Sequence, residues 1–181
     1  MSFANPAGDA AAAAPAYVGA LLALLGDRDP LEVAAELLPW LERRMAGLDD
    51  PTLRRPEAPG KWSAIQVIQH LADSEMVYAF RSRMILTADR PPLQGFDQDA
   101  WARSLRYAEM PLDVALAQLR GMRVANLRLW RSLTPAQRER GGLHSERGPE
   151  SLDLLLRLMG AHDLVHRRQI ERVLAAGAAE R

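Results

Sequence analysis

The amino-acid sequence predicts an all-α protein built around a four-helix bundle. Long segments carry apolar residues at helical spacing, and none alternates in the way of a half-buried β-strand. Glycine and proline gather between these segments, near positions 26–30, 51–60, 91–95 and 141–149. Because an amphipathic helix must bury its apolar face against another element, a bundle is the simplest fold for four such helices.

The start of the chain is expected to lie outside the bundle. We predict a flexible start over residues 1–28 that contains one short helix at Ala16–Leu25, followed by a single domain over residues 29–177. The first 15 residues contain no Lys or Arg, which a secretory signal requires. The apolar run after them is too short to span a bilayer. We therefore expect a cytoplasmic protein with no membrane partner.

The first long helix begins with a clear capping pattern. Asp29 is the expected N-cap, with Pro30 at the first helical position and Glu32 two residues later as its capping-box partner. An apolar stripe follows toward Leu48. Because proline removes a backbone donor and clashes with the preceding turn, a kink or break is expected at Pro39.

The second helix has the strongest start signal in the chain. Ser63 and Gln66 form a predicted capping box, and Trp62 can pack on Val67 as a hydrophobic staple. Its apolar stripe continues to about Leu86, and the segment from there to Met110 is an unusually long connection. Connections of this length in compact domains are often functional.

The remaining helices follow this connection. We expect a short helical turn at 97–104, a third long helix from about Pro111 to Leu133, and a fourth from a Ser151 N-cap to Gly177 as its C-terminal stop. The long link permits a crossover between the second and third helices in place of a tight antiparallel hairpin.

Composition excludes several classes of function. Lys+Arg and Asp+Glu both number 23, so the formal net charge is zero and the balance gives no indication of a nucleic-acid partner. The chain contains no cysteine, which excludes disulfides, cysteine-ligated zinc and an internal thiol nucleophile. A metal site in this protein must therefore use His, Asp, Glu or water.

Three of the four histidines form a predicted metal site. His162 and His166 fall within the apolar stripe of the fourth helix, one turn apart, so both imidazoles can reach one ion. The alternative for this pair alone is a satisfied core histidine beside an exposed one. His70 lies near the buried side of the second helix, and three buried imidazoles are costly unless something uses their lone pairs. We predict one divalent ion per chain held by His70, His162 and His166, with an open coordination position.

Other polar residues near the triad remain open. Asp73 and Gln169 are placed to hold the ligands in position, and Asp163 and Glu75 are close in sequence, but a solvated helix face is an equal expectation for each. His144 is expected to be a solvated loop histidine, with a role at the mouth of the site as the alternative. Core or pocket-wall positions are expected for Trp62, Trp101 and Trp130, and surface positions for Arg81, Arg83, Arg167 and Arg168.

Two motifs resemble those of a known family. The run from Lys61 to Glu75 and the run from His162 to Ile170 are similar to the second-helix and fourth-helix motifs of the DinB-like superfamily. The order of the histidines matches as well, as do 96–101 in the link and 144–151 before the last helix. Over residues 31–175 the chain resembles most the bacillithiol-transferase-like branch, whose members include proteins described as metal-dependent hydrolases. It departs from some relatives at Gln69 and Glu75.

The resemblance implies more than a fold. It implies a DinB-type bundle with a nickel or zinc ion, often as a homodimer, and a small-molecule substrate. Related members transfer low-molecular-weight thiols such as bacillithiol or mycothiol. A metal-dependent thiol S-transferase is the first hypothesis, and since the chain lacks cysteine, the thiol would come from a cosubstrate. A metal-dependent hydrolase and a non-enzymatic, stress-related metal-binding module are the alternatives.

Overall fold

The computed structural model describes residues 10–179, which contain eight α-helices, one short 3-10 helix and three short strands. Residues 1–9, within the segment expected to be flexible, lie outside this range. The elements are α1 (Ala10–Leu25), α2 (Pro30–Met45), α3 (Asp50–Arg54), α4 (Ala64–Thr87), β1 (Pro92–Leu93), α5 (Gln98–Ser104), η1 (Tyr107–Glu109), α6 (Leu112–Arg131), α7 (Pro135–Glu139), β2 (Gly141–His144), β3 (Gly148–Ser151) and α8 (Leu152–Ala179).

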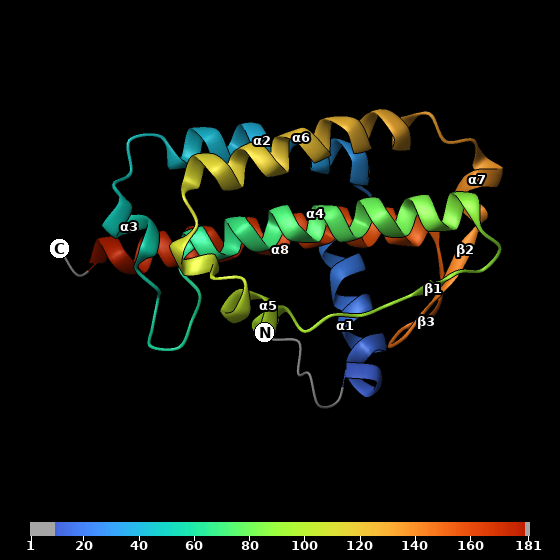
Figure 1. Ribbon diagram of the computed structural model, residues 1–181, viewed down its shortest axis with the longest axis horizontal. Helices are drawn as coiled ribbons and strands as arrows, with labels where there is room; N and C mark the ends of the chain where they lie inside the picture. Colours follow the sequence, from blue (N-terminus) through green and yellow to red (C-terminus); the bar gives the residue numbers. More distant parts are fainter. Residues whose placement is uncertain (1–9, 180–181) are drawn as a thin grey trace.

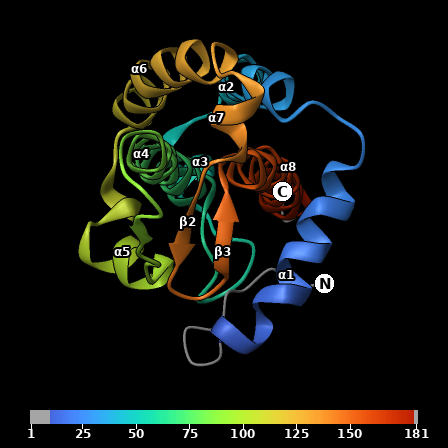
Figure 2. The same cartoon turned by 90° about the vertical axis from the view of Figure 1, so that its right-hand side faces the viewer.

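Four long helices form the bundle. Each of α2 and α4 packs against both α6 and α8, so the order around the bundle is α2, α6, α4, α8 (Figures 1 and 2). Their apolar faces fill one core cluster near the end occupied by α3 and a second near the end occupied by α7. No helix within residues 10–179 is long and apolar enough to cross a membrane.

The long link between α4 and α6 is a crossover, as expected. Contacts between these helices advance in the same direction along both, from Gln69–Gln118 to Glu75–Asn126, so α4 and α6 run parallel. The link must therefore carry the chain back along the whole length of α4, and β1, α5 and η1 lie on this return path (Figure 1).

Helix starts follow the capping predictions closely. Asp29 accepts a hydrogen bond from the Leu31 backbone at the start of α2, and Ser63 forms the expected capping box with Gln66 at the start of α4. Of the kink or break expected at Pro39, the break is wrong, because α2 is one helix through this residue. Tertiary packing of its buried face outweighs the loss of one backbone bond.

The predicted end of the last long helix at Gly177 is also wrong. α8 continues through Gly177 to Ala179, and Gly177 does not have the positive φ of a helix-terminating glycine. Its carbonyl instead accepts a hydrogen bond from Arg55 of the α3–α4 connection. An external donor therefore satisfies a carbonyl of the last turn that a glycine motif would otherwise satisfy.

Three short strands are the main departure from an all-helical chain. β1 pairs parallel with β2, and β2 pairs antiparallel with β3, at the end of the bundle near α7 (Figure 2). The strands are two to four residues long, and the β2–β3 hairpin contains three of the chain's glycines. Segments this short show no period-2 pattern, which is why the sequence does not indicate them.

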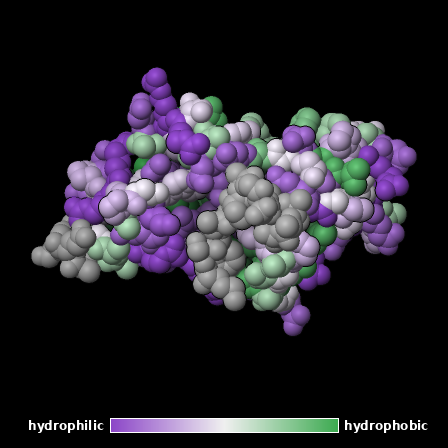
Figure 3. Space-filling model, turned by 90° about the horizontal axis from the view of Figure 1, so that it is seen from below, coloured by the Kyte–Doolittle hydropathy of each residue, from purple (hydrophilic) through white to green (hydrophobic). Residues whose placement is uncertain are grey.

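α1 packs along the outside of α8, with Leu21 and Leu25 buried against Leu158, Ala161 and Val165 (Figure 2). It begins at Ala10, six residues before the predicted start, within an alanine-rich segment of high helix propensity. On the face seen in Figure 3, hydrophilic residues are interspersed with smaller hydrophobic patches over the atoms that are coloured.

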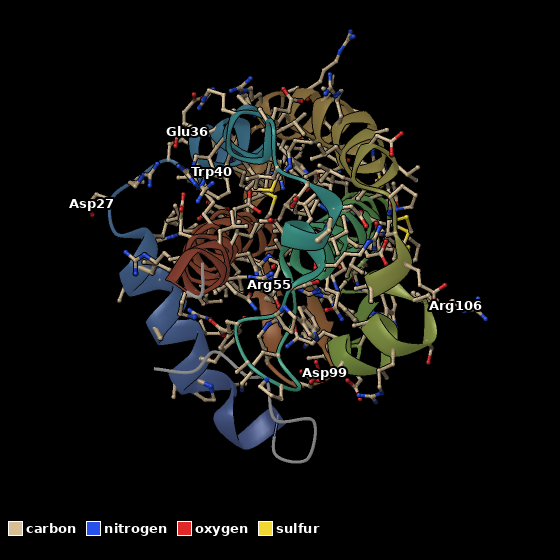
Figure 4. All side chains as sticks on the ribbon, turned by 90° about the vertical axis from the view of Figure 1, so that its left-hand side faces the viewer. Asp27, Glu36, Trp40, Arg55, Asp99 and Arg106 are labelled. Atoms are coloured by element: carbon tan, nitrogen blue, oxygen red, sulfur yellow. The ribbon has the colours of Figure 1, made fainter. Side chains whose placement is uncertain are left out.

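Surface ion pairs tie α2 to α8. The Arg167 guanidinium lies 3.2 Å from the Glu36 carboxylate and 5.1 Å from the centre of the Trp40 ring, which faces α8 from α2 (Figure 4). The predicted surface position of Arg167 is confirmed. Both helices run in the same direction here, and Gly160 of α8 lets them approach, since a Cβ at this position would lie 2.9 Å from the Pro30 Cα atom.

Candidate metal centre

The three predicted ligands meet between α4 and α8. His70 comes from α4, and His162 and His166 come from successive turns of α8, which packs antiparallel against α4. All three side chains are at least nine-tenths buried. The α4 capping box and the apolar stripes of the two helices set the register that brings these residues to one level of the bundle.

The nitrogen atoms converge on one point. The His162 Nε2 atom lies 3.0 Å from the His70 Nε2 atom and 3.0 Å from the His166 Nε2 atom. Two imidazole nitrogens bound at about 2.0–2.1 Å to one ion, with bonds near a right angle, would be separated by about 3 Å. The donor set and its spacing therefore fit one divalent ion.

Hydrogen bonding fixes the tautomer of His166. Its Nδ1 atom lies 2.7 Å from the Gln169 Oε1 atom, and an amide oxygen can only accept. The Nδ1 atom of the neutral ring therefore carries the proton, and the Nε2 lone pair faces the other two histidines. Of the two expectations for Gln169, this contact favours support of His166 over a solvated helix face.

Burial keeps the imidazoles neutral. Desolvation is the main cause that lowers the pKa of His166 to about 4, and it lowers the pKa values of His70 and His162 well below their usual range. Neighbouring histidines and, for His162, the Arg123 guanidinium lower these values further. Because only neutral imidazole binds metal, the three lone pairs are available at neutral pH.

A buried ion-pair network lies behind the histidines. Arg123 of α6 lies 2.6 Å from the Asp163 carboxylate of α8 and 2.9 Å from the Glu75 carboxylate of α4, and it also donates to the Ala34 carbonyl of α2. Asn126 donates to Glu75 at 2.7 Å. The expectation of a solvated helix face for Glu75 and Asp163 is therefore wrong, because a guanidinium from a third helix neutralises both carboxylates inside the bundle.

Asp73 belongs to a second buried network. Its carboxylate accepts hydrogen bonds from Tyr107 at 2.6 Å, Gln118 at 2.7 Å and Gln69 at 3.0 Å. These bonds join α4 to η1 and α6. Asp73 therefore fixes the end of the crossover link, and it makes no contact that would position His70.

A pocket opens beside the three histidines and extends along α4. His70 and His162 line its inner end, and it holds about 620 Å³ of space including its open mouth. Tyr78 lines its wall. The long link contributes Phe96, whose ring packs 4.4 Å from the ring of Trp101, and the β2–β3 hairpin contributes His144. Both segments thus form the mouth, as the alternative for His144 proposed.

Two residues at this mouth differ from the surface positions expected for them. His144 is only 3% exposed, because β2 places it beneath the hairpin, and Arg81 is 6% exposed and donates to the Gln94 carbonyl of the link. Neither burial is visible in the local sequence, since both depend on the crossover link folding back over α4. Trp130, by contrast, is fully buried in the core as predicted.

Comparison with known proteins gives the same fold. The solved structure of YfiT from Bacillus subtilis, described as a probable metal-dependent hydrolase with an unusual four-helix bundle topology, superposes with a TM-score of 0.74. It is 28% identical, and the match covers 80% of this chain and 83% of that one.

Two bacterial relatives carry the name "Putative metal-dependent hydrolase". A Geobacillus thermodenitrificans protein is 34% identical over 105 residues, which cover 58% of this chain and 59% of that protein. A Bacillus mycoides protein is 29% identical over 154 residues, which cover 85% and 88%. The sequence model of the DinB superfamily matches residues 39–170, a span that includes α4, the crossover link and all three converging histidines. The chain belongs to the DinB superfamily.

Proposed function

We propose that this protein binds one divalent metal ion through His70, His162 and His166 and transfers a low-molecular-weight thiol to a small electrophilic substrate. The observation that carries the proposal is the convergence of three Nε2 atoms, with 3.0 Å between neighbouring pairs, at the inner end of a pocket. Zinc and nickel are the ions that three imidazoles and an open position suit best.

The chemistry of the pocket wall favours a thiol over water as the nucleophile. A bound divalent ion supplies Lewis acidity, which lowers the pKa of a coordinated thiol or water. A free thiol, with a pKa of about 8.5, needs much less help than water to lose its proton. Hydrolytic sites of the HExxH type add a carboxylate base beside the histidines, whereas the carboxylates next to the histidines in this sequence, Asp73, Glu75 and Asp163, are all engaged in networks away from the pocket. The pocket-lining Glu146 comes instead from the hairpin.

The chain's own residues would hold the reactants. His70 and His162 face the pocket, and Tyr78 and Phe96 offer aromatic surface to the apolar part of a substrate. The chain has no cysteine, so the thiol has to enter through the mouth as a cosubstrate. Closure of the mouth by the link and the hairpin would limit access of water to the bound reactants.

Metal-dependent hydrolysis is the second candidate. It is favoured by the names of the Geobacillus and Bacillus relatives and of YfiT. Water coordinated at the open position would then replace the thiol, and Glu146, a pocket-lining carboxylate, would be the available base.

A thiol screen tests the proposal. Zinc-loaded and nickel-loaded protein are supplied in turn with bacillithiol, mycothiol, glutathione and coenzyme A together with a simple electrophile, and metal-free protein is the blank. We expect at least one thiol to react faster than in the blank, and we expect His70→Ala to remove that rate. Cleavage of simple esters or amides without any thiol effect would replace transfer by hydrolysis. No reaction of either kind with any metal would favour a non-enzymatic metal-binding module.

Assembly and location remain predictions. A homodimer is proposed because Phe80 of α4 and Val124 of α6, on neighbouring helices, are each 64% exposed and would be covered by a partner. Size-exclusion chromatography with light scattering measures this directly. A cytoplasmic location stays a prediction as well.

A further inference from the structure

The outer part of the pocket contains hydrogen-bond donors that no residue of 10–179 uses. Arg81 of α4, His144 of β2 and Arg147 of the hairpin turn line it, about three helical turns along α4 from His70. Desolvation by burial, together with the two nearby guanidinium groups, lowers the pKa of His144 to about 3. The imidazole of His144 is therefore neutral at pH 7.

The hairpin fixes which nitrogen of His144 carries the proton. The Nδ1 atom accepts hydrogen bonds from the backbone N–H groups of Glu146, at 3.1 Å, and Arg147, at 3.3 Å. Since Nδ1 is an acceptor, the Nε2 atom of the neutral ring must carry the hydrogen. This Nε2–H group is buried and has no acceptor within hydrogen-bond distance in the described part of the chain.

Arg81 is a buried guanidinium without a carboxylate partner. It is 6% exposed, and no Asp or Glu of residues 10–179 forms an ion pair with it. One of its NH2 groups donates to the Gln94 carbonyl, but its Nε–H group has no partner among the residues that the structure describes. A buried cation is costly without a counter-charge, so its burial indicates that a ligand supplies one.

Glu150 and Glu146 attract the Arg81 guanidinium and oppose the fall in its pKa that burial causes, but neither forms an ion pair with it. Arg147 donates twice to Glu150, at 2.7 and 3.0 Å, so these two groups neutralise each other. Glu146 lines the pocket, and its carboxylate lies against Gly95, where a Cβ would be 2.5 Å from its Oε1 atom. This carboxylate would repel a doubly charged ligand more strongly than a singly charged one.

We propose that Arg81 and His144 form a subsite that binds a single carboxylate group of the substrate or of the thiol cosubstrate. The Arg81 Nε–H and His144 Nε2–H groups are the donors, and the guanidinium is the counter-charge. Assigning the carboxylate to a reactant rests on the proposed function, whereas binding of the anion itself does not. Because residues 70 and 81 lie on one face of α4, with Cα atoms about 16 Å apart, the carboxylate is several bonds distant from the reacting atom.

Acetate is the probe, and acetamide is its neutral counterpart of the same shape. Zinc-loaded protein is titrated with each while the Arg81 Nε–H and His144 Nε2–H resonances are followed by ¹⁵N NMR. The titration is repeated on His162→Ala protein, which lacks one proposed metal ligand. The titration of this variant therefore measures acetate binding whether or not the three histidines bind a metal ion. We expect acetate to shift both resonances saturably in both proteins, and acetamide to bind at least tenfold more weakly.

Matched variants identify the donors. Arg81→Gln should weaken acetate binding about tenfold or more, whereas Arg83→Gln, two residues along α4 and outside the pocket, should leave it unchanged. His144→Asn places an acceptor where Nδ1 lies and removes the Nε2 donor, so it should weaken binding about threefold to tenfold. His144→Gln keeps a donor at the Nε2 position and should bind more tightly than His144→Asn.

Three results would overturn the subsite. The first is the absence of a saturable shift of the Arg81 resonance with acetate in either protein. The second is an equal affinity for acetate and acetamide, and the third is an unchanged acetate affinity in Arg81→Gln. Tighter binding of inorganic phosphate than of acetate would overturn the assignment to a singly charged carboxylate.

Discussion

At the scale of single residues, the metal centre depends on which nitrogen of each imidazole is free. Gln169 holds the proton of His166 on Nδ1, so the Nε2 lone pair faces His162 at 3.0 Å. The His70 Nδ1 atom, in contrast, is buried and has no hydrogen-bond partner within residues 10–179. A hydrogen bond therefore orients one proposed ligand, His166, whereas packing orients another, His70, whose ring lies 5.1 Å from the Trp62 ring.

Replacing Gln169 should weaken metal binding without removing a ligand. In Gln169→Leu the His166 Nδ1–H group loses its acceptor, and we expect the affinity for zinc to fall about tenfold to a hundredfold. Competition with a chromophoric chelator measures this. Gln169→Glu keeps an acceptor and should retain the affinity, and Arg168→Ala, on the adjacent exposed position, is the control. Equal affinity of the Leu variant and the unchanged protein would contradict this role.

The three converging histidines could be found from the sequence, but their surroundings could not. Spacing on one helix face links His162 to His166, and His70 has a similar position on its own helix. The burial of Glu75 and Asp163 depends on Arg123, which reaches them from another helix. One signal was available, because Arg123 stands four residues after Leu119 and four before Leu127 in an otherwise apolar stripe.

At the scale of elements, the same guanidinium joins four helices. Arg123 of α6 contacts carboxylates of α4 and α8 and a carbonyl of α2. Each carboxylate is more than nine-tenths buried, and desolvation raises the pKa of both Glu75 and Asp163, although Arg123 opposes the increase. Removing the arginine would leave two buried carboxylates without a counter-charge.

Arg123→Met should therefore destabilise the bundle by about 3–5 kcal/mol. Arg120→Met is the matched control, since Arg120 lies one turn earlier on α6 and pairs with Glu42 at the surface. Exposed pairs of this kind contribute about 0–1 kcal/mol, so this variant should unfold close to the unchanged protein. Urea denaturation of both variants measures the difference. Similar losses in the two would show that the buried network adds nothing beyond an ordinary surface pair.

Helix boundaries are predicted correctly from the sequence where a capping residue determines them. Capping residues at Asp29 and Ser63 marked the starts of α2 and α4 correctly, because a cap acts within one turn. Tertiary contacts decided the cases that failed. Packing of its buried face keeps α2 helical through Pro39. At the end of α8, Arg55 donates a hydrogen bond to the Gly177 carbonyl, and the helix continues past this residue. Pairing with β1 stabilises a strand in the glycine-rich hairpin.

At the scale of the whole molecule, the crossover is what creates the pocket. The length of the link indicates the crossover. The helix order α2, α6, α4, α8 cannot be predicted from hydrophobic periodicity, because periodicity identifies the buried face of a helix and not the helix that packs against it. Only after the link folds back do Phe96 and the hairpin cover α4 beside the histidines. Packing of α4 on α8 together with this covering buries four imidazoles, and burial lowers the pKa of each.

Metal-free protein should lose stability as the solution becomes acidic. The pKa of His166 is about 4 and that of His144 about 3 in the folded chain, against about 6.5 when unfolded. Between these values the unfolded state binds more protons, so stability falls as the pH drops below about 6.5, by about 1.4 kcal/mol per pH unit for each such histidine. The raised pKa values of Glu75 and Asp163 oppose this trend.

Urea denaturation of metal-free protein at about pH 7, 6 and 5 measures the slope. His144→Asn removes one of the titrating groups and should make the slope shallower by about the contribution of one histidine. A stability that stays constant from pH 7 to pH 5, or a slope unaffected by this substitution, would contradict the burial of neutral imidazoles.

The central claim is that three histidines bind one metal ion, and the metal content of the purified chain tests it most directly. Protein prepared without a histidine tag is equilibrated with zinc or nickel, freed of excess ion, and measured by elemental analysis. We predict about one ion per chain in the unchanged protein and in His144→Asn, and loss of the ion in His70→Ala, His162→Ala and His166→Ala, provided that each variant is folded by circular dichroism. Retention of a full equivalent of metal in all three alanine variants would contradict the claim.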